Sequence, residues 1–402
     1  MPFRNTYQGK RVLVTGHTGF KGSWLCEWLI ALGADVTGFA LPPATNPALF
    51  DQLGLSVRMH HIIGDVRDLQ ALRRVVEELR PEFVFHLAAQ PLVRLSYEQP
   101  VETYATNVMG TVNVLEAIRL SRCACAVVVV TTDKCYENKE WLHSYREEDP
   151  LGGYDPYSSS KGAAELVIAS YRRSYFSGLD SMVRLASARA GNVIGGGDWA
   201  LDRIVPDCIR SLQRGEAIPV RNKIATRPWQ HVLEPLSGYL WLGAQLAVAS
   251  AVVQVSSSRT RPEHGIGTDY LNESCSGNFN LQLKRLKALS SSFNFGPALS
   301  SNRTVAELVE EILKHWPGKW EDKSDQKAVH EAKLLNLATD KAHHLLGWSP
   351  AWNFSETIRQ TVAWHRIANS AGVDFRSLTR GQIKDYAATA RAAGVAWAKG
   401  NR

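Results

Sequence analysis

The chain lacks the features that would place it in a membrane or on nucleic acid. Its longest apolar runs fall far short of the roughly 18–20 residues that span a bilayer, so we expect no membrane helix. Residues 1–5 contain no signal-peptide core, which favours a cytoplasmic location. No dense basic run with interleaved aromatic residues is present, and a net charge of +7 is modest for 402 residues. We therefore expect no nucleic-acid partner.

Cysteine is scarce, and its spacing excludes the common metal and redox motifs. The six cysteines stand at positions 26, 123, 125, 135, 208 and 275. Positions 123 and 125 are too close together for the usual zinc knuckle. His86 lies in an apolar run, and no partner ligands stand at metal spacing around it. We expect reduced buried thiols, a core histidine and no metal site.

The first part of the chain reads as a strand, a glycine-rich turn and a helix. An apolar strand pattern at residues 11–15 runs into glycines spaced G-x-x-G-x-x-G, and helical spacing follows from Trp24 to Leu32. Such glycines allow a tight turn and let a pyrophosphate approach the N–H groups at the helix start. The residues expected to form this dinucleotide site are Gly16, Thr18, Gly19, Phe20 and Gly22.

The acidic residue that usually holds the adenosine ribose of NAD is missing. It normally stands about twenty residues past the first glycine, at the end of the second strand. Residues 36–40 there are Val-Thr-Gly-Phe-Ala, and Asp35 comes too early. No nearby Arg or Lys marks a pocket for a 2′-phosphate. The local sequence leaves NAD and NADP open and predicts looser binding at the adenosine end.

Strand and helix patterns alternate up to about residue 180. Apolar strand patterns precede residue 64 and cover 83–90 and 126–130, while a helical pattern covers 103–120. This order predicts an α/β fold with a doubly wound parallel sheet. We expect residues 1–180 to form the nucleotide-binding domain, with later strands returning to it. Residues 181–402 are expected to form mainly a smaller substrate-binding lobe.

The strongest chemical pattern lies between residues 131 and 161. Thr131-Thr132-Asp133-Lys134-Cys135-Tyr136 directly follows the strand at 126–130 and so stands at a carboxyl strand end, where open α/β sheets bind ligands. Tyr157 and Lys161 are four apart in a helical pattern, so their side chains share one face. We expect the lysine ammonium to lower the tyrosine pKa from about 10, which makes a base usable near neutral pH.

Taken together, these motifs resemble the sugar-nucleotide 4,6-dehydratases of the extended short-chain dehydrogenase/reductase family, and Lys134 is typical of their CDP-glucose branch. The segments that carry the resemblance are residues 16–24, 88–97, 133–136, 190–199 and 227–232. The resemblance covers about residues 8–245 and resumes from 294 to about 364. It implies a Rossmann-type fold, NAD as cofactor and a homodimer or higher homo-oligomer. The implied reaction converts CDP-glucose to CDP-4-keto-6-deoxyglucose for deoxysugars of surface polysaccharides such as O-antigen.

The resemblance also implies a role for each catalytic candidate. Tyr157 would take the proton of the sugar 4-hydroxyl, Thr132 would bond the 4-oxygen, and Lys161 would bond the nicotinamide ribose. Asp133 would protonate the leaving 6-hydroxyl, which requires a raised pKa. Lys134 replaces a glutamate of the dTDP-glucose and GDP-mannose enzymes. It can take the C5 proton only as a neutral amine, and otherwise would stabilise an enolate as a cation.

Further residues are implied to contact the cofactor or the substrate. The cofactor candidates outside the glycine turn are Asp65, Val66, Ala88, Ala89, Gln90 and Asn107, of which Asn107 also fits a structural role in the core. Arg227 is the best candidate to clamp the substrate pyrophosphate, because a guanidinium matches phosphate oxygens in a fork. The other substrate candidates are Asn192, Arg203, Arg221 and Arg94, and Arg94 fits a structural role equally well.

Residues 252–292 depart from the resembled enzymes, which have a shorter link there. This insertion is Ser-rich without clear periodicity, so we expect a surface loop or short hairpin. The expected dimer would pair helices at 102–120 and 157–176. Two alternative functions stay open. An epimerase or reductase of the same family would not need an acid at Asp133, and a non-catalytic nucleotide sensor would usually lose Tyr157 or Lys161.

Overall fold

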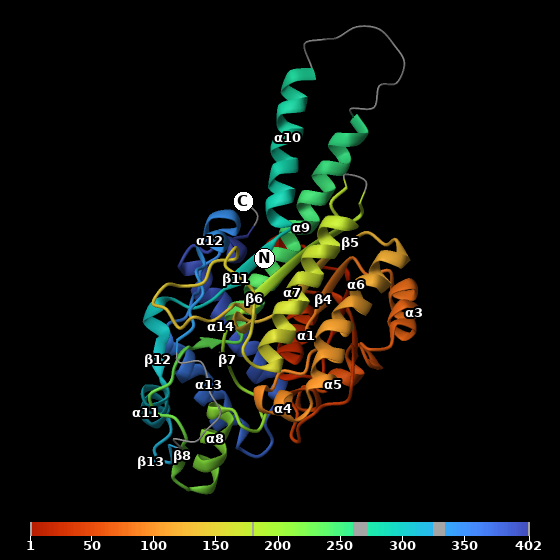
Figure 1. The fold of residues 1–402 in the computed structure, drawn as a ribbon. Coiled ribbons are helices and arrows are strands. Elements are labelled where there is room, and N and C mark those ends of the chain that lie inside the picture. Colours follow the sequence, from red (N-terminus) through yellow and green to blue (C-terminus); the bar gives the residue numbers. More distant parts are fainter. Residues whose placement is uncertain (1, 179–180, 260–271, 325–333, 401–402) are drawn as a thin grey trace.

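A parallel sheet of seven strands forms the centre of the molecule (Figure 1). The computed structural model describes residues 2–178, 181–259, 272–324 and 334–400, with the backbone alone at 250–259 and 272–279. The sheet strands are β1 (Arg11–Thr15), β2 (Asp35–Ala40), β3 (His60–Ile63), β4 (Phe83–His86), β5 (Cys125–Val130), β6 (Val183–Ala190) and β11 (Ser292–Phe295). Their spatial order is β11-β6-β5-β4-β1-β2-β3. The chain thus moves outward from β1 and then restarts on its other side, which confirms the predicted doubly wound fold.

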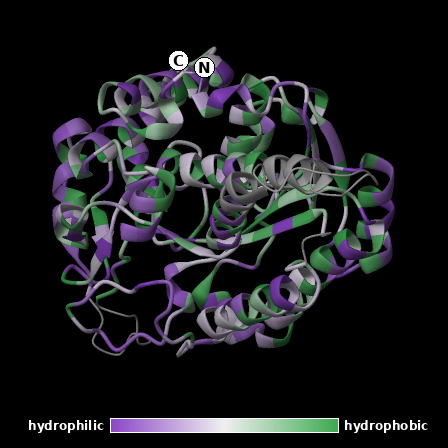
Figure 2. Cartoon of the chain, turned by 90° about the horizontal axis from the view of Figure 1, so that it is seen from above, coloured by the Kyte–Doolittle hydropathy of each residue, from purple (hydrophilic) through white to green (hydrophobic). Residues whose placement is uncertain are grey.

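The strands are apolar on both sides because each face of the sheet is covered. In β1, Val12 and Val14 belong to one hydrophobic core, and Leu13, which points the other way, belongs to a second. Helices lie on both sides of the sheet when the molecule is seen from above (Figure 2). The helices that pack in the first core are α1 (Phe20–Ala31), α9 (Leu233–Arg259) and α14 (Phe375–Ala392). Those of the second core are α3 (Leu69–Leu79), α6 (Gly110–Ser121) and α7 (Pro156–Ser174).

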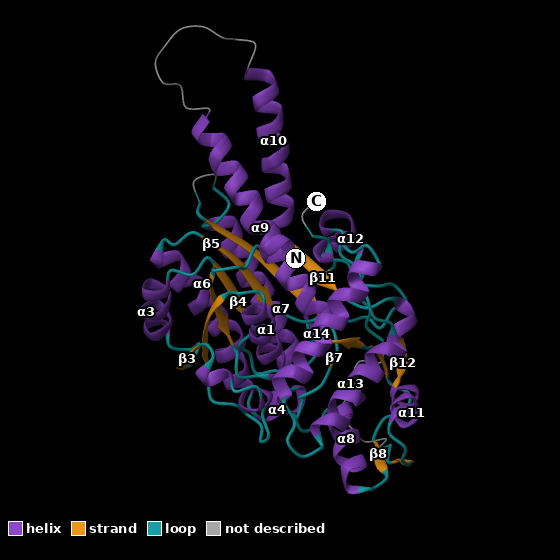
Figure 3. Ribbon diagram, turned by 180° about the vertical axis from the view of Figure 1, so that it is seen from behind, coloured by secondary structure: helices purple, strands orange, loops and turns teal. Residues whose placement is uncertain are grey.

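A smaller lobe with a third core is formed by chain that follows β6 (Figures 1 and 3). Its helices are α8 (Ile204–Arg214), α11 (Val305–His315) and α13 (Phe354–Ala368). Its short strands pair as β7 (Val193–Ile194) with β10 (Gln230–His231), β8 (Ile218–Val220) with β13 (Trp320–Asp322), and β9 (Thr226–Pro228) with β12 (Asn302–Thr304). The other helices are α2 (Leu49–Gln52), α4 (Val93–Glu98), α5 (Pro100–Tyr104), α10 (Asn272–Leu289) and α12 (Asp340–Leu346).

Two elements near the predicted cofactor site differ from the expected ones. Strand β4 stops at His86 instead of residue 90, because the N–H of Gln90 donates to the Asn107 side chain at 2.8 Å instead of joining the sheet. The helical pattern at 103–120 is divided by a π-helical turn, Ala105–Met109, which carries Asn107. Such turns are frequent at functional sites.

The expectation of a surface loop at residues 252–292 was wrong in its described parts. Residues 252–259 continue α9, and residues 272–289 form α10 beside it, so that two helices project beyond the sheet (Figure 1). At their base, Arg285 donates to Gln245 at 2.8 Å, and Leu286 is buried in the first core. Residues 260–271 lie outside the described residues. Tertiary packing at the base therefore outweighs the weak local helix signal.

The thiols and His86 lie where the sequence predicted. Within the described side chains, five cysteines are free and buried, while Cys275 lies outside that set. His86 is buried between Thr15 and Thr111, with its Nδ1 2.6 Å from the Thr15 hydroxyl. In the described ranges no three His, Cys, Asp or Glu side chains gather as metal ligands, and no helix there is long and apolar enough to cross a bilayer.

Candidate active site

The residues after β5 place a buried carboxyl group at the carboxyl edge of the sheet. Thr131 stays paired to β6, and Thr132 then begins a single 3-10 turn, Asp133–Cys135. The Thr132 hydroxyl donates to Asp133 Oδ1 at 2.9 Å. Asp133 is 3% exposed, and a Cβ on Gly191 would come within 2.6 Å of its Oδ2. A larger residue at 191 would therefore displace this carboxyl group.

Burial raises the pKa of Asp133 above its usual value, although the charges of Lys134 and Arg227 oppose the shift. This confirms the raised pKa that was expected for a residue acting as an acid. Lys134, the next residue of the turn, is half-buried.

Tyr157 and Lys161 lie on the first turns of α7. Asp155 caps this helix by accepting the Ser158 N–H at 2.9 Å, and both Tyr157 and Lys161 are buried. The expected lowering of the Tyr157 pKa by Lys161 was wrong. Burial raises the pKa of Tyr157 to about 12, although a hydrogen bond with Thr132 and the charge of Arg203 lower it. Burial also lowers the pKa of Lys161 to about 8.

A buried ion pair holds this corner of the site together. Glu165, one turn after Lys161, accepts from Thr131 at 2.5 Å and from Ser187 and Arg189 at 2.8 Å each. Although burial raises it, the charge of Arg189 and its hydrogen bond hold the pKa of Glu165 below the usual value. The carboxylate therefore ties α7 to the ends of β5 and β6. Sequence reasoning missed this pair, because neither residue belongs to a recognised catalytic motif.

Sequence reasoning also missed Lys21 and Tyr239. Lys21 stands inside the glycine-rich motif, between two of the residues that were expected to bind the dinucleotide, but no role was assigned to it. Its Nζ lies 5.8 Å from the centre of the Tyr239 ring. Burial lowers the pKa of Lys21 to about 7, and the charges of Arg203 and Lys161 lower it further. Tyr239 belongs to α9 and reaches this place only through the tertiary fold.

The glycine-rich turn fits the pyrophosphate of a dinucleotide. A Cβ on Gly16, which has φ +73°, would lie 2.6 Å from the Ala88 nitrogen, and a Cβ on Gly22 would lie 2.2 Å from the Gly16 oxygen. A Cβ on Gly19 would meet only one atom, at 3.5 Å, so this side of the turn is open. Helix α1 begins at Phe20 without a side-chain cap, which leaves its first N–H groups for an anion.

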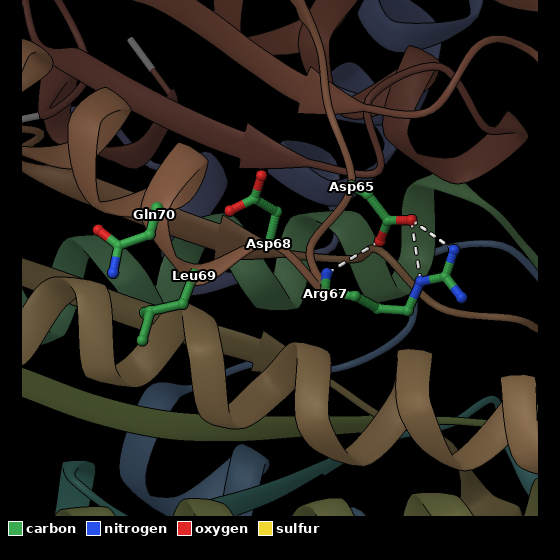
Figure 4. Close-up of a pocket in the computed structure, with 5 residues that line it drawn as sticks. All are labelled: Asp65, Arg67, Asp68, Leu69 and Gln70. Atoms are coloured by element: carbon green, nitrogen blue, oxygen red, sulfur yellow. Dashed lines mark hydrogen bonds and ion pairs between the residues drawn. The ribbon is translucent and has the colours of Figure 1, made fainter.

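The other cofactor candidates are partly engaged by neighbours. Thr18 donates to the Leu41 carbonyl at 2.8 Å. Asp65 lines an open pocket, where its Oδ2 accepts from Arg67 Nε and Nη2 at 2.9 and 2.7 Å (Figure 4). The Val66 side chain is buried in the second core. The structure thus gives Asp65 a protein partner that the sequence did not suggest.

Asn107 has the structural role that the sequence left open. Its amide accepts from the Gln90 N–H and donates to the Ser160 hydroxyl at 2.9 Å. The Gln90 side chain is itself bonded to Leu92 and Thr103. Ala88 and Ala89 are half-buried, and Ala88 borders the glycine-rich turn. Asn107 therefore fixes the loop after β4 against α7, next to Lys161.

The candidate arginines fall into two groups. Arg203 pairs with Asp198 at 3.0 Å, and its charge lowers the pKa of Tyr157. The charge of Arg227, on β9, lowers the pKa of Asp133. Both arginines therefore influence the catalytic candidates. Arg94 and Arg221 instead form an exposed network on Asp202, at 3.5 and 2.8 Å. Asn192 is half-buried and directly follows the glycine that packs on Asp133.

Comparison with known sequences links the chain to dehydratases. The family model for GDP-mannose 4,6 dehydratase matches residues 13–261. CDP-glucose 4,6-dehydratase of Salmonella typhimurium is 45% identical over 390 residues, which is 95% of this chain and 98% of the relative. dTDP-glucose 4,6-dehydratase of Haemophilus influenzae is 24% identical over 371 residues, 90% of this chain and 99% of the relative.

Solved structures share the fold. DesIV of Streptomyces venezuelae, a dTDP-glucose 4,6-dehydratase with NAD bound, has a TM-score of 0.67 at 24% identity and covers 89% of this chain and 97% of its own. UDP-glucose 4-epimerase of Thermotoga maritima has a TM-score of 0.68 at 20% identity, over 90% of this chain and 100% of its own. The same fold thus carries both dehydratases and epimerases, and the site residues must distinguish the two activities.

Proposed function

This chain belongs to the GDP-mannose 4,6 dehydratase family, and from that premise we propose that it converts CDP-glucose to CDP-4-keto-6-deoxyglucose with NAD as cofactor. The observation that carries the proposal is Asp133, a buried carboxyl group with a raised pKa beside Tyr157. An epimerase needs the tyrosine base, but it needs no acid that protonates a leaving hydroxyl. The nucleotide is proposed from the relative that is 45% identical.

The glycine-rich turn and the start of α1 would hold the cofactor pyrophosphate, and Lys161 would bond the nicotinamide ribose. NAD bound there would supply hydride transfer, taking the hydride from C4 of the sugar and giving it back at C6. As the phenolate, Tyr157 accepts the proton of the 4-hydroxyl while C4 is oxidised. The Thr132 hydrogen bond and the Arg203 charge favour that step, because both lower the Tyr157 pKa.

The 4-ketone makes the C5 proton acidic, which prepares loss of water. Asp133 donates its proton to the 6-hydroxyl, which leaves as water while the C5–C6 double bond forms. Lys134 acts at C5 as a neutral amine that accepts the proton. An ammonium at this position would instead stabilise the enolate and leave the C5 proton to another base.

We also propose that the enzyme works in the cytoplasm as a homodimer and supplies deoxysugars for surface polysaccharides such as O-antigen. The products of the proposed reaction are nucleotide-activated sugars, which polysaccharide synthesis consumes. Exposed apolar side chains on α5 and α7, such as Val101 at 77% and Leu166 at 63%, support a second copy as the partner.

Incubation with NAD⁺ and a panel of nucleotide sugars tests the activity, with loss of water followed by mass spectrometry. We expect loss of water from CDP-glucose, and none from CDP-glucose with the Tyr157→Phe variant. Water loss from dTDP-glucose or GDP-mannose instead would overturn the nucleotide assignment. Inversion of a sugar centre without loss of water would establish an epimerase.

A further inference from the structure

The turn that follows β5, residues 132–135, is held by hydrogen bonds at both of its ends, and we call it the catalytic turn. Before it, the Thr131 hydroxyl donates to Glu165 Oε1 at 2.5 Å. After it, the Tyr136 hydroxyl accepts from Arg189 Nη1 at 2.8 Å. The proposed acid and its neighbour Lys134 lie between these two anchors. Their position therefore depends on side chains that come from other elements.

One arginine joins the two anchors. Besides its bond to Tyr136, Arg189 donates through Nη2 to Glu165 Oε2 at 2.8 Å and through Nη1 to the Glu147 carbonyl at 3.0 Å. Its guanidinium carbon lies 4.9 Å from the centre of the Tyr136 ring. Both side chains are buried, so water does not compete for these bonds. A planar guanidinium makes several such bonds at once, whereas an ammonium group offers a single centre.

The sheet fixes the other side of the Tyr136 hydroxyl. This hydroxyl donates to Asn294 Oδ1 at 2.8 Å, and the Asn294 amide donates to the Tyr145 carbonyl at 2.9 Å. Asn294 lies on β11 and stands opposite Arg189 of β6 in the register of the two strands. The hydroxyl is therefore held between neighbouring residues of two paired strands, which a fully bonded buried network keeps rigid.

The catalytic turn also rests directly on α7. A Cβ on Gly162 would lie 3.2 Å from the Cys135 carbonyl oxygen, so the backbone of the turn packs against the helix at this glycine. Gly162 directly follows Lys161, and Glu165 lies one turn further along the same helix. The helix that carries the proposed base thus meets the turn that carries the proposed acid through one packing contact and one hydrogen-bonded network.

We propose that Arg189 and Tyr136 are positioning residues for the loss of water, an inference that rests on the proposed function. They hold the Asp133 carboxyl group in place against a sugar that is bound at Tyr157. Glu165 ties α7 to β5 and β6 without the help of Tyr136, because Thr131 and Ser187 also donate to it. Release of the Tyr136 anchor therefore displaces the acid and leaves the base where it is.

The first test removes only the Tyr136 hydroxyl. When Tyr136→Phe is mixed with CDP-glucose and NAD⁺ in a stopped-flow experiment, NADH absorbance should rise within about twofold of the wild-type rate. Its decay should slow about tenfold to a hundredfold, because a displacement of about 1 Å costs a reaction step that much. Quenched samples should contain the oxidised sugar that still carries its 6-hydroxyl. Arg189 keeps its bonds to Glu165 and Glu147, so the variant should fold.

Tyr145→Phe is the matched control. Tyr145 is as buried as Tyr136, and the two rings stack with their centres 5.1 Å apart. Its hydroxyl, however, accepts from the Lys139 N–H at 2.7 Å, in the loop after the catalytic turn. The control also loses a buried hydrogen bond, so its unfolding midpoint should fall. The ratio of NADH rise to NADH decay should stay at the wild-type value.

The second test asks whether the two residues act as one unit. Arg189→Lys keeps a positive charge beside Glu165 but cannot bridge Glu165 and Tyr136, so NADH decay should slow as in Tyr136→Phe. The double variant should be no slower than the slower single variant, because both substitutions remove the same link. Independent losses that multiply in the double variant would overturn the joint role.

The outcomes separate this inference from the proposed function. A wild-type protein that forms no NADH and releases no water from CDP-glucose would overturn the proposed function itself. Wild-type turnover with an unchanged NADH decay in Tyr136→Phe would overturn the inference alone. Equal slowing of NADH rise and NADH decay in that variant would also overturn it, since the hydroxyl would then support the site as a whole.

Discussion

Burial is the common cause behind the chemistry of single residues in this site. It raises the pKa of Tyr157 to about 12, raises that of Asp133, and lowers that of Lys161 to about 8. Each shift favours the neutral form, because a low-dielectric pocket disfavours charge. A pocket of neutral acids and bases moves protons when a bound ligand brings charge or polarises a bond.

Tyr157→Phe tests the proposed base. We expect turnover to fall by about 10²–10⁴-fold, because the group that accepts the 4-hydroxyl proton is lost. The free energy of unfolding should change by less than about 1 kcal/mol, since the backbone N–H of residue 157 still donates a hydrogen bond to the Ser96 hydroxyl. Tyr175→Phe, at the exposed end of the same helix, should keep wild-type activity. Near wild-type turnover in the Tyr157→Phe variant would refute the role.

Asp133→Asn tests the proposed acid. The substitution removes a proton donor but leaves the path for C4 oxidation, so water loss should slow more than oxidation does. Absorbance of NADH should then persist after substrate is mixed with the variant in a stopped-flow experiment. If C4 oxidation falls as far as in Tyr157→Phe, Asp133 does not act specifically in the loss of water.

At the scale of elements, the end of β2 decides how the adenosine end of the cofactor is held. The strand ends without an acidic residue, and Gly38 packs directly against the His17 ring. His17 Nε2 lies 2.7 Å from Nδ1 of His61 on β3. This edge of the site is therefore lined by imidazoles where many relatives hold the ribose with a carboxylate.

We expect NAD⁺ to exchange freely as a result. The missing carboxylate should cost roughly 1.5–3 kcal/mol, or about ten- to a hundredfold in affinity. Purified protein should therefore need added NAD⁺ for full activity. The measurement is the amount of dinucleotide that is released when the purified protein is denatured. Stoichiometric NAD⁺ in that supernatant, with no stimulation by added cofactor, would show that other contacts replace the acid.

The helices proposed to form the dimer present fewer apolar side chains than their sequences suggested. Leu115, Ile118 and Ile168 lie in the second core, whereas Leu166 is 63% exposed. Together with Val101 on α5, it leaves an apolar surface that pairing would cover. We expect light scattering at micromolar concentration to give the mass of a dimer or higher oligomer, and Leu166→Glu to weaken it. Monomer alone would contradict the proposal.

Across the whole molecule, buried histidines couple folding to pH. Burial lowers the pKa of His86, His231 and His365 to about 3 and that of His17 to about 4. Each of these groups is neutral in the folded protein and gains a proton on unfolding once the pH falls below about 6.5. Carboxyl groups whose pKa burial raises act in the opposite direction, among them Glu234, with a pKa of about 7, Asp133 and Glu147.

The free energy of unfolding should therefore fall as the pH drops from 6.5 towards 4, by up to about 1.4 kcal/mol per pH unit for each buried histidine. Denaturant titrations at pH 7.5, 6 and 5 would measure the slope. His86→Gln should reduce the slope, and His344→Gln, on the exposed side of α12, should not. A free energy that stays constant over this range would contradict the assignment.

The sequence by itself determined the parts of this protein whose physics is local. Strand, glycine turn and helix at residues 11–32 depend on apolar spacing and on backbone freedom at Gly16, and both are visible in the letters. The same holds for Tyr157 and Lys161, because a helix puts residues four apart on one face. These local rules were enough to predict the doubly wound sheet and the edge at which its ligands bind.

Only the tertiary structure decided the properties that depend on distant neighbours. The pKa of Tyr157 is raised and not lowered because the side chain is buried, and no local sequence pattern predicts that burial. Residues 252–259 and 272–289 are helical although their composition favours a loop. Lys21 and Tyr239 are 218 positions apart in the chain, and only the folded structure brings the Lys21 Nζ to 5.8 Å from the Tyr239 ring centre. Charge and burial act through space, and the sequence shows them only where neighbours in space are also neighbours in the chain.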